Sequence, residues 1–202
     1  MFKFLALLSL FLTSTVFSQG KVLFFAGSTR EGSFNKQLLQ EAASLARQMD
    51  VEVNVVDLKD YTMPIYEADL EAKEGMPINA KKLRRKMVDC STIVIASPEY
   101  NHSVSPLLVN ILAWTSRSEQ GGPSREAFKG KKFILLSVSP GQGGGARGLV
   151  HLRDMIEDVG GEVVKRQLSI SNAHQAFNAE GRLKDKTSQK ALKELMGEIS
   201  LY

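Results

Sequence analysis

Cysteine and histidine are scarce in this sequence, and their scarcity removes two kinds of site. Cys90 is the single cysteine among 202 residues, which excludes a disulfide framework within the chain and a cysteine-rich metal site. The three histidines, His102, His151 and His174, are too scattered to indicate a zinc site. A strong charge of one sign is lacking too, because the net charge of +4 is mild and spread along the chain. The excess weakly favours anionic ligands and does not indicate a nucleic-acid partner.

The apolar run at the N-terminus is too short to span a bilayer. It covers residues 4–17 and follows Lys3, whereas a transmembrane helix needs roughly 20 apolar residues. Val16 and Ser18 fit the small-residue pattern of a cleavage site after Ser18. We therefore expect residues 1–18 to be a signal peptide, which would make the protein exported (periplasmic or secreted). The alternatives are an uncleaved membrane anchor, or a buried N-terminal strand or helix in a cytoplasmic protein.

The rest of the chain has the composition of one globular domain. Over the full 202 residues, hydrophobic residues make up 43% and charged residues 24%, so a sizeable core can form. No internal repeat or low-complexity linker divides residues 19–202.

Strand and helix signals alternate along this domain. Short apolar runs predict strands at residues 21–26, 51–58, 91–96, 132–138 and 162–167. Between and after them, amphipathic or capped stretches predict helices at about 33–49, 77–88, 103–117, 146–159 and 186–201. Residues 59–76, which are rich in charge, are expected to form a surface excursion. This rhythm predicts an α/β fold, a flavodoxin-like doubly wound five-stranded parallel sheet of order 2-1-3-4-5.

Such a sheet places its ligand at the carboxyl ends of its strands, so the loops there are the candidate site. The first loop, GSTREGSFN at residues 27–35, lacks the lysine of a P-loop and the G-x-G-x-x-G of a dinucleotide fold. Its hydroxyls, its arginine and the N-terminus of the next helix nevertheless suit a phosphate group. The candidate phosphate ligands are Ser28, Arg30, Ser33 and Asn35. The alternative is an ordinary capped turn between strand and helix.

The second and third loops follow the third and fourth predicted strands. At residues 97–102, Pro98 stiffens the turn and Tyr100 offers an aromatic face to a planar ring. His102 is interpreted as a surface or helix-start residue rather than a proton donor. At residues 139–147, four glycines allow a ligand to approach the main chain closely. A plain surface turn and a plain flexible loop are the respective alternatives.

Together the three loops resemble a known family. GSTREGSFN, SPEYNHSVSP and SPGQGGGARG, in this order, are similar to motifs of the NADPH-dependent FMN reductase family, which includes chromate, quinone and azo-dye reductases. The resemblance covers about residues 21–196 and implies bound FMN. It implies phosphate contacts from Ser28, Arg30, Ser33 and Asn35. It implies that the flavin ring lies between two sets of residues: Pro98, Glu99, Tyr100 and Asn101 on one side, and Ser139, Gly141, Gly143 and Gly144 on the other.

The resemblance also implies an activity and an assembly. The activity is hydride transfer from NADPH (or NADH) to FMN, followed by reduction of a small acceptor such as a quinone, azo compound, chromate or free flavin. No general acid or base is evident in the three loops, and this chemistry needs none. A homodimer is expected. Relatives often carry a lysine and an aspartate where this chain has Val109 and Ala113, which weakens the expectation of a tetramer.

Three other functions remain open at this stage. A flavodoxin-like electron carrier is disfavoured by the basic charge, because such carriers are typically acidic. A non-catalytic FMN-binding redox sensor would keep the loops but not the reaction. A phosphate-binding hydrolase is the least supported, since neither a Ser-His-Asp set nor paired carboxylates cluster in the loops. By position, residues 59–76 and 171–182 are expected to frame the acceptor pocket or the dimer contact.

Overall fold

Parallel strands form the centre of the computed structural model, which describes residues 20–49 and 51–200. The strands β1 (Lys21–Ala26), β2 (Glu52–Val56), β3 (Thr92–Ala96) and β6 (Lys132–Val138) lie in the order β2-β1-β3-β6. Beyond β6, the short strands β7 (Glu162–Val163) and β8 (Leu168–Ile170) both pair with it in parallel. The order confirms the predicted flavodoxin-like fold.

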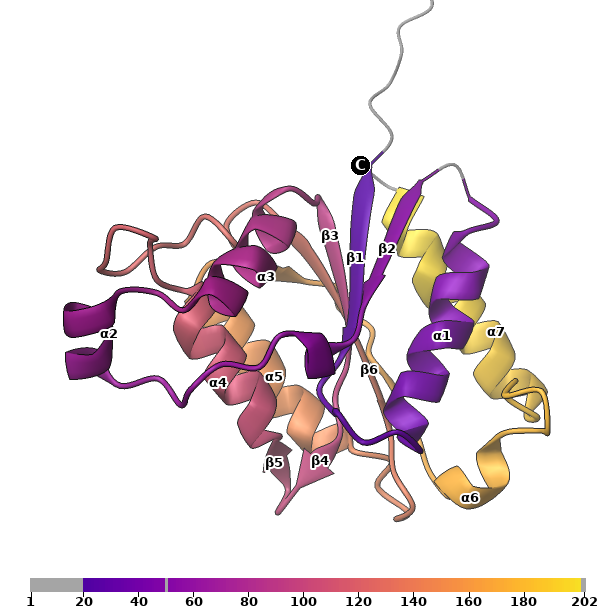
Figure 1. Cartoon of the computed structure of the whole chain (residues 1–202). Helices are drawn as coiled ribbons and strands as arrows, with labels where there is room; N and C mark the ends of the chain where they lie inside the picture. The colour runs from indigo at the N-terminus through magenta and orange to yellow at the C-terminus, as the bar shows by residue number, and fades with distance from the viewer. Residues whose placement is uncertain (1–19, 50, 201–202) are drawn as a thin grey trace, which may run out of the picture.

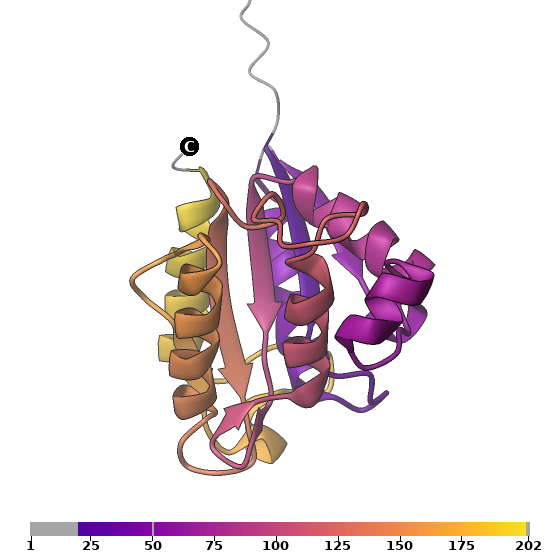
Figure 2. The same cartoon turned by 90° about the vertical axis from the view of Figure 1, so that its left-hand side faces the viewer.

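Helices cover both faces of this sheet (Figure 1). Helices α1 (Phe34–Ala46) and α7 (Lys186–Gly197) lie on one face. On the other lie α3 (Ile78–Val88), α4 (Pro106–Thr115) and α5 (Ala146–Asp158), and Figure 2 shows α4 and α5 side by side in front of the sheet. No helix among the described residues has the length and apolar character to cross a bilayer. The predicted signal peptide or anchor, residues 1–18, lies outside the described residues.

The alternation of side chains along β1 divides the core into two layers. Val22 and Phe24 point into a cluster with α1 and α7, whereas Leu23 and Phe25 point into a cluster with α3, α4 and α5. Because both faces of the sheet are covered, β1 is an almost uninterrupted apolar run, as expected for a central parallel strand.

The predicted fifth strand at residues 162–167 is wrong in its extent. The strand is interrupted after Val163, and strand structure begins again at Leu168 with β8. The main-chain carbonyls of the stretch between them bond to the guanidinium of Arg153 from α5 instead of to a neighbouring strand. Arg153 donates to the carbonyls of Val163 (3.1 Å), Val164 (2.6 Å) and Lys165 (3.3 Å).

The predicted helix at residues 103–117 begins later than expected. Glu99–Tyr100 (β4) and Ser103–Val104 (β5) pair in an antiparallel hairpin, and α4 starts at Pro106 after its cap Ser105. The hairpin turns tightly because Asn101 and His102 both adopt the left-handed conformation, with φ of 51° and 61°.

The excursion at residues 59–76 contains helical segments that were not predicted, and α4 holds it in place. It includes the end of a short 3-10 helix (Leu58–Asp60) and the helix α2 (Ala68–Glu74). Asn110 of α4 accepts from the Tyr66 N–H (2.8 Å) and donates to the Pro64 carbonyl (2.9 Å), and the Trp114 indole donates to the same carbonyl (2.9 Å). These two α4 residues therefore attach the excursion to the rest of the domain.

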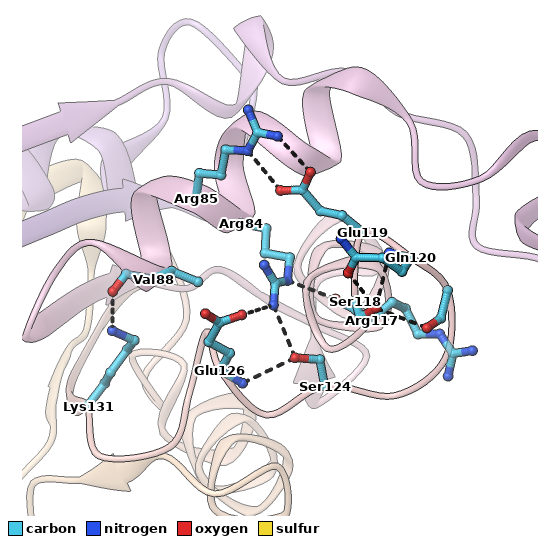
Figure 3. A network of polar contacts seen from close by, with 11 residues as sticks. Arg84, Arg85, Val88, Arg117, Ser118, Glu119, Gln120, Ser124, Glu126 and Lys131 are labelled. Carbon is cyan, nitrogen blue, oxygen red and sulfur yellow. Dashed lines mark hydrogen bonds and ion pairs between the residues drawn. The ribbon is translucent and has the colours of Figure 1, made fainter.

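Charged side chains hold the connection between α4 and β6 against α3 (Figure 3). Arg84 is buried and donates to the Arg117 carbonyl (2.8 Å), to the Ser124 hydroxyl (3.0 Å) and to Glu126. Lys131, also buried, donates to the Val88 carbonyl (2.6 Å) and the Cys90 carbonyl (2.7 Å).

Candidate functional site

The three predicted loops meet at one edge of the sheet, at the foot of Figure 1. Hydrogen bonds tie neighbouring loops together: the Ser105 hydroxyl donates to the Gly27 carbonyl (3.0 Å), and the Ser137 hydroxyl donates to the Ser97 carbonyl (2.7 Å). The edge is therefore one continuous surface made by the ends of β1, β3 and β6.

The first loop presents a cation and a helix N-terminus. Ser28 and Ser33 are buried, and Ser33 caps α1 by accepting from the Lys36 N–H (3.4 Å). The first N–H groups of α1 have no acceptor within the helix, so they are available to an anion. Arg30 is exposed and, among the described residues, pairs with no carboxylate, whereas Lys36 is bound to Asp57 (2.6 Å).

The Lys36–Asp57 pair is reflected in the electrostatics of Asp57. Burial alone would raise the pKa of this carboxyl, but hydrogen bonds from Lys36 and from the Lys59 N–H outweigh it and lower the pKa. Asp57 therefore stays charged and holds Lys36, which leaves Arg30 as the cation for a ligand in this loop.

Asn35 has a different position from the other three candidate phosphate ligands. Its side chain is only 4% exposed, and its amide donates to the Val138 carbonyl (3.0 Å) and accepts from the Val138 N–H (3.1 Å). The side chain thus joins α1 to the end of β6, and the main-chain N–H is the part of Asn35 left for an anion. Its role as a phosphate ligand stays a prediction.

The second loop forms the β4–β5 hairpin, with Pro98 buried and Tyr100 52% exposed. The Glu99 carboxylate points towards α5, where it accepts from the Gly148 N–H (2.8 Å). His102 is exposed, as predicted, and contacts Arg147. The hairpin therefore offers the Tyr100 ring to a ligand and uses Glu99 to fix its own position.

A serine and a histidine approach each other on the outside of this hairpin. Ser103 Oγ lies 3.1 Å from His151 Nδ1 of α5. In the part of the chain that the structure describes, no ion pair joins His151 to a carboxylate. The pair has no third member to orient the imidazole, so it gives no support to a hydrolase.

The third loop uses its glycines in two ways. Gly144 and Gly145 have φ of 61° and 89°, and a Cβ on Gly145 would lie 1.9 Å from Ser137 Oγ, so the fold requires both glycines. A Cβ on Gly143 would meet nothing within 4 Å, and one on Gly141 would approach only Ser139 Oγ at 3.8 Å. The main chain at Gly141 and Gly143 therefore borders open space that a flat ligand can occupy.

The family of the chain follows from comparison with known proteins. A family model described as NADPH-dependent FMN reductase matches residues 20–175. The chain belongs to this family. Its curated relatives include an NAD(P)H-dependent FMN reductase of Pseudomonas aeruginosa, 32% identical over 90% of this chain and 94% of the relative. An NADPH:quinone oxidoreductase of Arabidopsis thaliana is 30% identical over 90% of this chain and 91% of the relative.

Solved structures agree on the fold of the FMN reductase family. The flavoenzyme NAD(P)H:(acceptor) oxidoreductase FerB from Paracoccus denitrificans superimposes with a TM-score of 0.75 at 24% identity, covering 89% of this chain and 94% of that one. The azoreductase AzrA gives a TM-score of 0.58 at 16% identity, with 90% and 100% covered. The predicted family, fold and class of activity, NAD(P)H-dependent FMN reduction, are confirmed.

The loops fit the cofactor that the family name implies. An FMN phosphate needs a cation and N–H donors, which Arg30 and the first turn of α1 supply. A flavin ring needs a flat cradle, and the open side of Gly141 and Gly143 provides one. The chain's single thiol takes no part, because Cys90 is buried and burial raises its pKa to about 11.

The stretch after β8, residues 171–182, was predicted by position to frame the acceptor pocket or the dimer contact, and that role stays a prediction. Sequence reasoning missed that the start of this stretch is hydrogen-bonded to the third loop. The Ser139 N–H donates to the Ile170 carbonyl (3.0 Å), the Ala173 N–H donates to the Ser139 carbonyl (3.0 Å), and the Ser171 hydroxyl donates to the Gln142 carbonyl (2.7 Å). A cavity of about 540 Å³ lies beside this stretch, between α6 (Ala173–Ala176) and the start of α7. A sequence signal was present at Asn172, a residue type that tolerates the left-handed conformation it adopts here (φ 52°).

Proposed function

We propose that the protein binds FMN across the three loops, reduces it with NADPH or NADH, and passes the electrons to a small acceptor. The observation that carries the proposal is the juxtaposition at one sheet edge of Arg30, which pairs with no carboxylate among the described residues, a capped helix N-terminus and an open glycine main chain. Family membership supports the same function independently.

In this proposal the first loop holds the phosphate. Arg30 makes a charge-assisted contact, the hydroxyls of Ser28 and Ser33 line the loop, and Asn35 contributes its main-chain N–H. The N-terminus of α1 adds the favourable end of its dipole.

The second and third loops hold the ring. Pro98, Glu99, Tyr100 and Asn101 form one wall, in which Glu99 anchors the hairpin to α5. Ser139, Gly141, Gly143 and Gly144 form the other wall, where Gly141 and Gly143 present main chain with open space beside it.

The chain's contribution to catalysis is position and polarity rather than acid–base chemistry. FMN, when bound, accepts a hydride from a nicotinamide and gives electrons to a second substrate. The main-chain N–H groups of the third loop supply dipoles that favour negative charge on an adjacent ligand. The ring of Tyr100, which is 52% exposed beside the hairpin turn, is accessible to nicotinamide and acceptor in turn.

The acceptor class and the assembly belong to the same proposal. The names of the relatives, which include quinone reductases, favour a quinone or a similar small aromatic oxidant. We expect a homodimer that buries Val109 of α4 and Val150 of α5, which are 42% and 51% exposed on the same side of the sheet. Val109 and Ala113 offer no charge for the further contacts of a tetramer.

The test is the affinity of the full chain for FMN and for riboflavin, which lacks the phosphate. Arg30→Ala is expected to weaken FMN binding several-fold and to leave riboflavin binding unchanged, because one charge-assisted contact to the phosphate is lost. Flavin-fluorescence titration of the apoprotein measures both dissociation constants. The matched control is Arg85→Ala, which removes an exposed arginine that pairs with Glu119 far from the loops. Unchanged FMN affinity in Arg30→Ala would contradict the assignment.

A further inference from the structure

Arg30 lies over a stack of aromatic rings that comes from two distant parts of the chain. Its guanidinium carbon is 5.8 Å from the centre of the Phe34 ring. The Phe34 ring is in turn parallel to that of Phe177, with 6.3 Å between centroids and 1° between planes. His174 packs edge-on against Phe34, with 5.0 Å between centroids. An exposed side chain of the first loop thus rests on residues that follow the last strand.

The ring of Phe34 is what restrains this arginine. Among the described residues no carboxylate pairs with Arg30, and the neighbouring Glu31 is bound to Lys59 (3.2 Å). A guanidinium over an aromatic face within about 6 Å is held by a cation–π attraction. An exposed arginine loses conformational entropy when it binds a phosphate. The contact with Phe34 makes this loss smaller, because the side chain is already restrained before the phosphate binds.

Phe177 is itself fixed at both ends of its segment. On one side, Ala173 is buried and bonds through its N–H to the third loop. On the other, the Leu183 N–H donates to the buried Glu41 carboxylate of α1 (2.8 Å), and Phe177 and Leu183 form an antiparallel bridge. The segment from α6 to Leu183 therefore connects the third loop to α1, and it places the Phe177 ring against Phe34.

We propose that Phe177, acting through the ring of Phe34, is a positioning residue for Arg30 in phosphate recognition. Phe177 would touch neither the flavin ring nor the phosphate. It supports the face on which Arg30 rests, so its removal affects ligands that carry a phosphate and spares those that do not. The inference rests on the proposed function, in which Arg30 contacts the FMN phosphate.

The experiment compares FMN with riboflavin in four forms of the full chain: wild type, Phe177→Leu, Phe177→Tyr and Arg30→Ala. The measured quantity is the preference for FMN, which is the ratio of the riboflavin and FMN dissociation constants. Phe177→Leu should lower this preference by up to about fivefold, the size of a fully lost exposed cation–π contact, because Phe34 keeps its ring but loses the ring that supports it. Phe177→Tyr keeps a ring beneath Phe34 and should retain the preference.

A fifth form, Arg30→Ala with Phe177→Leu, makes the experiment a double-mutant cycle. If Phe177 acts through Arg30, adding Phe177→Leu to Arg30→Ala should not lower the preference for FMN any further. Additive losses would contradict the inference, as would an equal weakening of both ligands by Phe177→Leu, which denotes a merely structural role. An unchanged preference in Phe177→Leu would contradict it too. A wild type with no preference for FMN would instead overturn the proposed function.

Discussion

The proposed ligand-binding edge and the outer flank of this molecule are built from different kinds of contact. At the edge, the hydrogen bonds that join the loops involve main-chain groups, either on both sides, as between Ser139 and Ile170, or opposite an uncharged side chain, as between the Ser137 hydroxyl and the Ser97 carbonyl. At the flank, side-chain charges join α2, α3 and the α4–β6 connection: Arg117 pairs with Glu71 (2.8 Å) and Arg85 with Glu119 (2.6 Å). Main-chain groups cannot be removed by substitution, so the edge is expected to be sensitive mainly to side chains that are added.

The same difference separates binding from stability. The proposed ligand contacts at the edge come from glycines, hydroxyls, the hairpin with Tyr100, and Arg30, which among the described residues pairs with no carboxylate. The flank contains the buried charges Glu71 and Arg84, whose partners are all in the protein. Substitutions at the flank should therefore change the free energy of unfolding and leave flavin affinity intact.

The largest effect is expected from a methyl group added to the third loop. Gly145→Ala would place a Cβ 1.9 Å from Ser137 Oγ at a φ of 89°, which only glycine adopts readily. We expect a loss of about 2–5 kcal/mol in the free energy of unfolding, together with loss of FMN binding, because the backbone must move. Urea unfolding and flavin titration measure the two losses.

Gly143→Ala is the matched control for that prediction. A Cβ there meets nothing within 4 Å, and Gly143 has no positive φ, so the free energy of unfolding should not fall. If both alanine variants were equally destabilised, the steric explanation for Gly145 would be wrong.

A smaller effect is expected at the flank from Glu71→Gln. The carboxylate accepts from Arg117 Nε (3.0 Å) and from the Tyr66 hydroxyl (3.1 Å), and the Arg117 bond lowers the pKa of Glu71 against the opposing effect of burial. Because Arg117 is partly exposed, we expect a loss of only about 1–2 kcal/mol in stability. Affinity for FMN should be unchanged, which a flavin titration of the same variant checks.

The pH dependence of that loss gives a second test. A lowered folded-state pKa stabilises the protein above the unfolded value of about 4.3 and loses this contribution as the pH falls through the folded value. The difference in unfolding free energy between wild type and Glu71→Gln should therefore be largest near neutral pH and shrink below about pH 4.3. A difference that stays constant down to pH 3 would show that the charge of Glu71 is not its cause.

The smallest effect is expected from Glu119→Gln, which breaks the pair between the half-buried Glu119 and the exposed Arg85. Exposed ion pairs are screened by solvent and contribute little, so the midpoint of thermal unfolding should not change measurably. A loss as large as that of Glu71→Gln would remove the distinction between buried and surface charges on this flank.

Sequence reasoning located the fold and the loops because those signals are local. The apolar run at residues 21–26 and the small residues that follow it are read within one stretch of chain. The bond between Asn35 and Val138 joins residues 103 positions apart, so no local pattern could show that the Asn35 amide is already occupied. The contact of Phe177 with Phe34 and the interruption between β7 and β8 by Arg153 are tertiary in the same sense.

The central claim, a flavin site that a nicotinamide can reduce, is tested most directly by the absorbance spectrum of the FMN-loaded protein without oxygen, before and after NADPH is added. The account predicts that FMN stays with the protein and that its visible absorbance bleaches promptly, with no acceptor present. Flavin that fails to bind, or that stays oxidised with both NADPH and NADH, would contradict it.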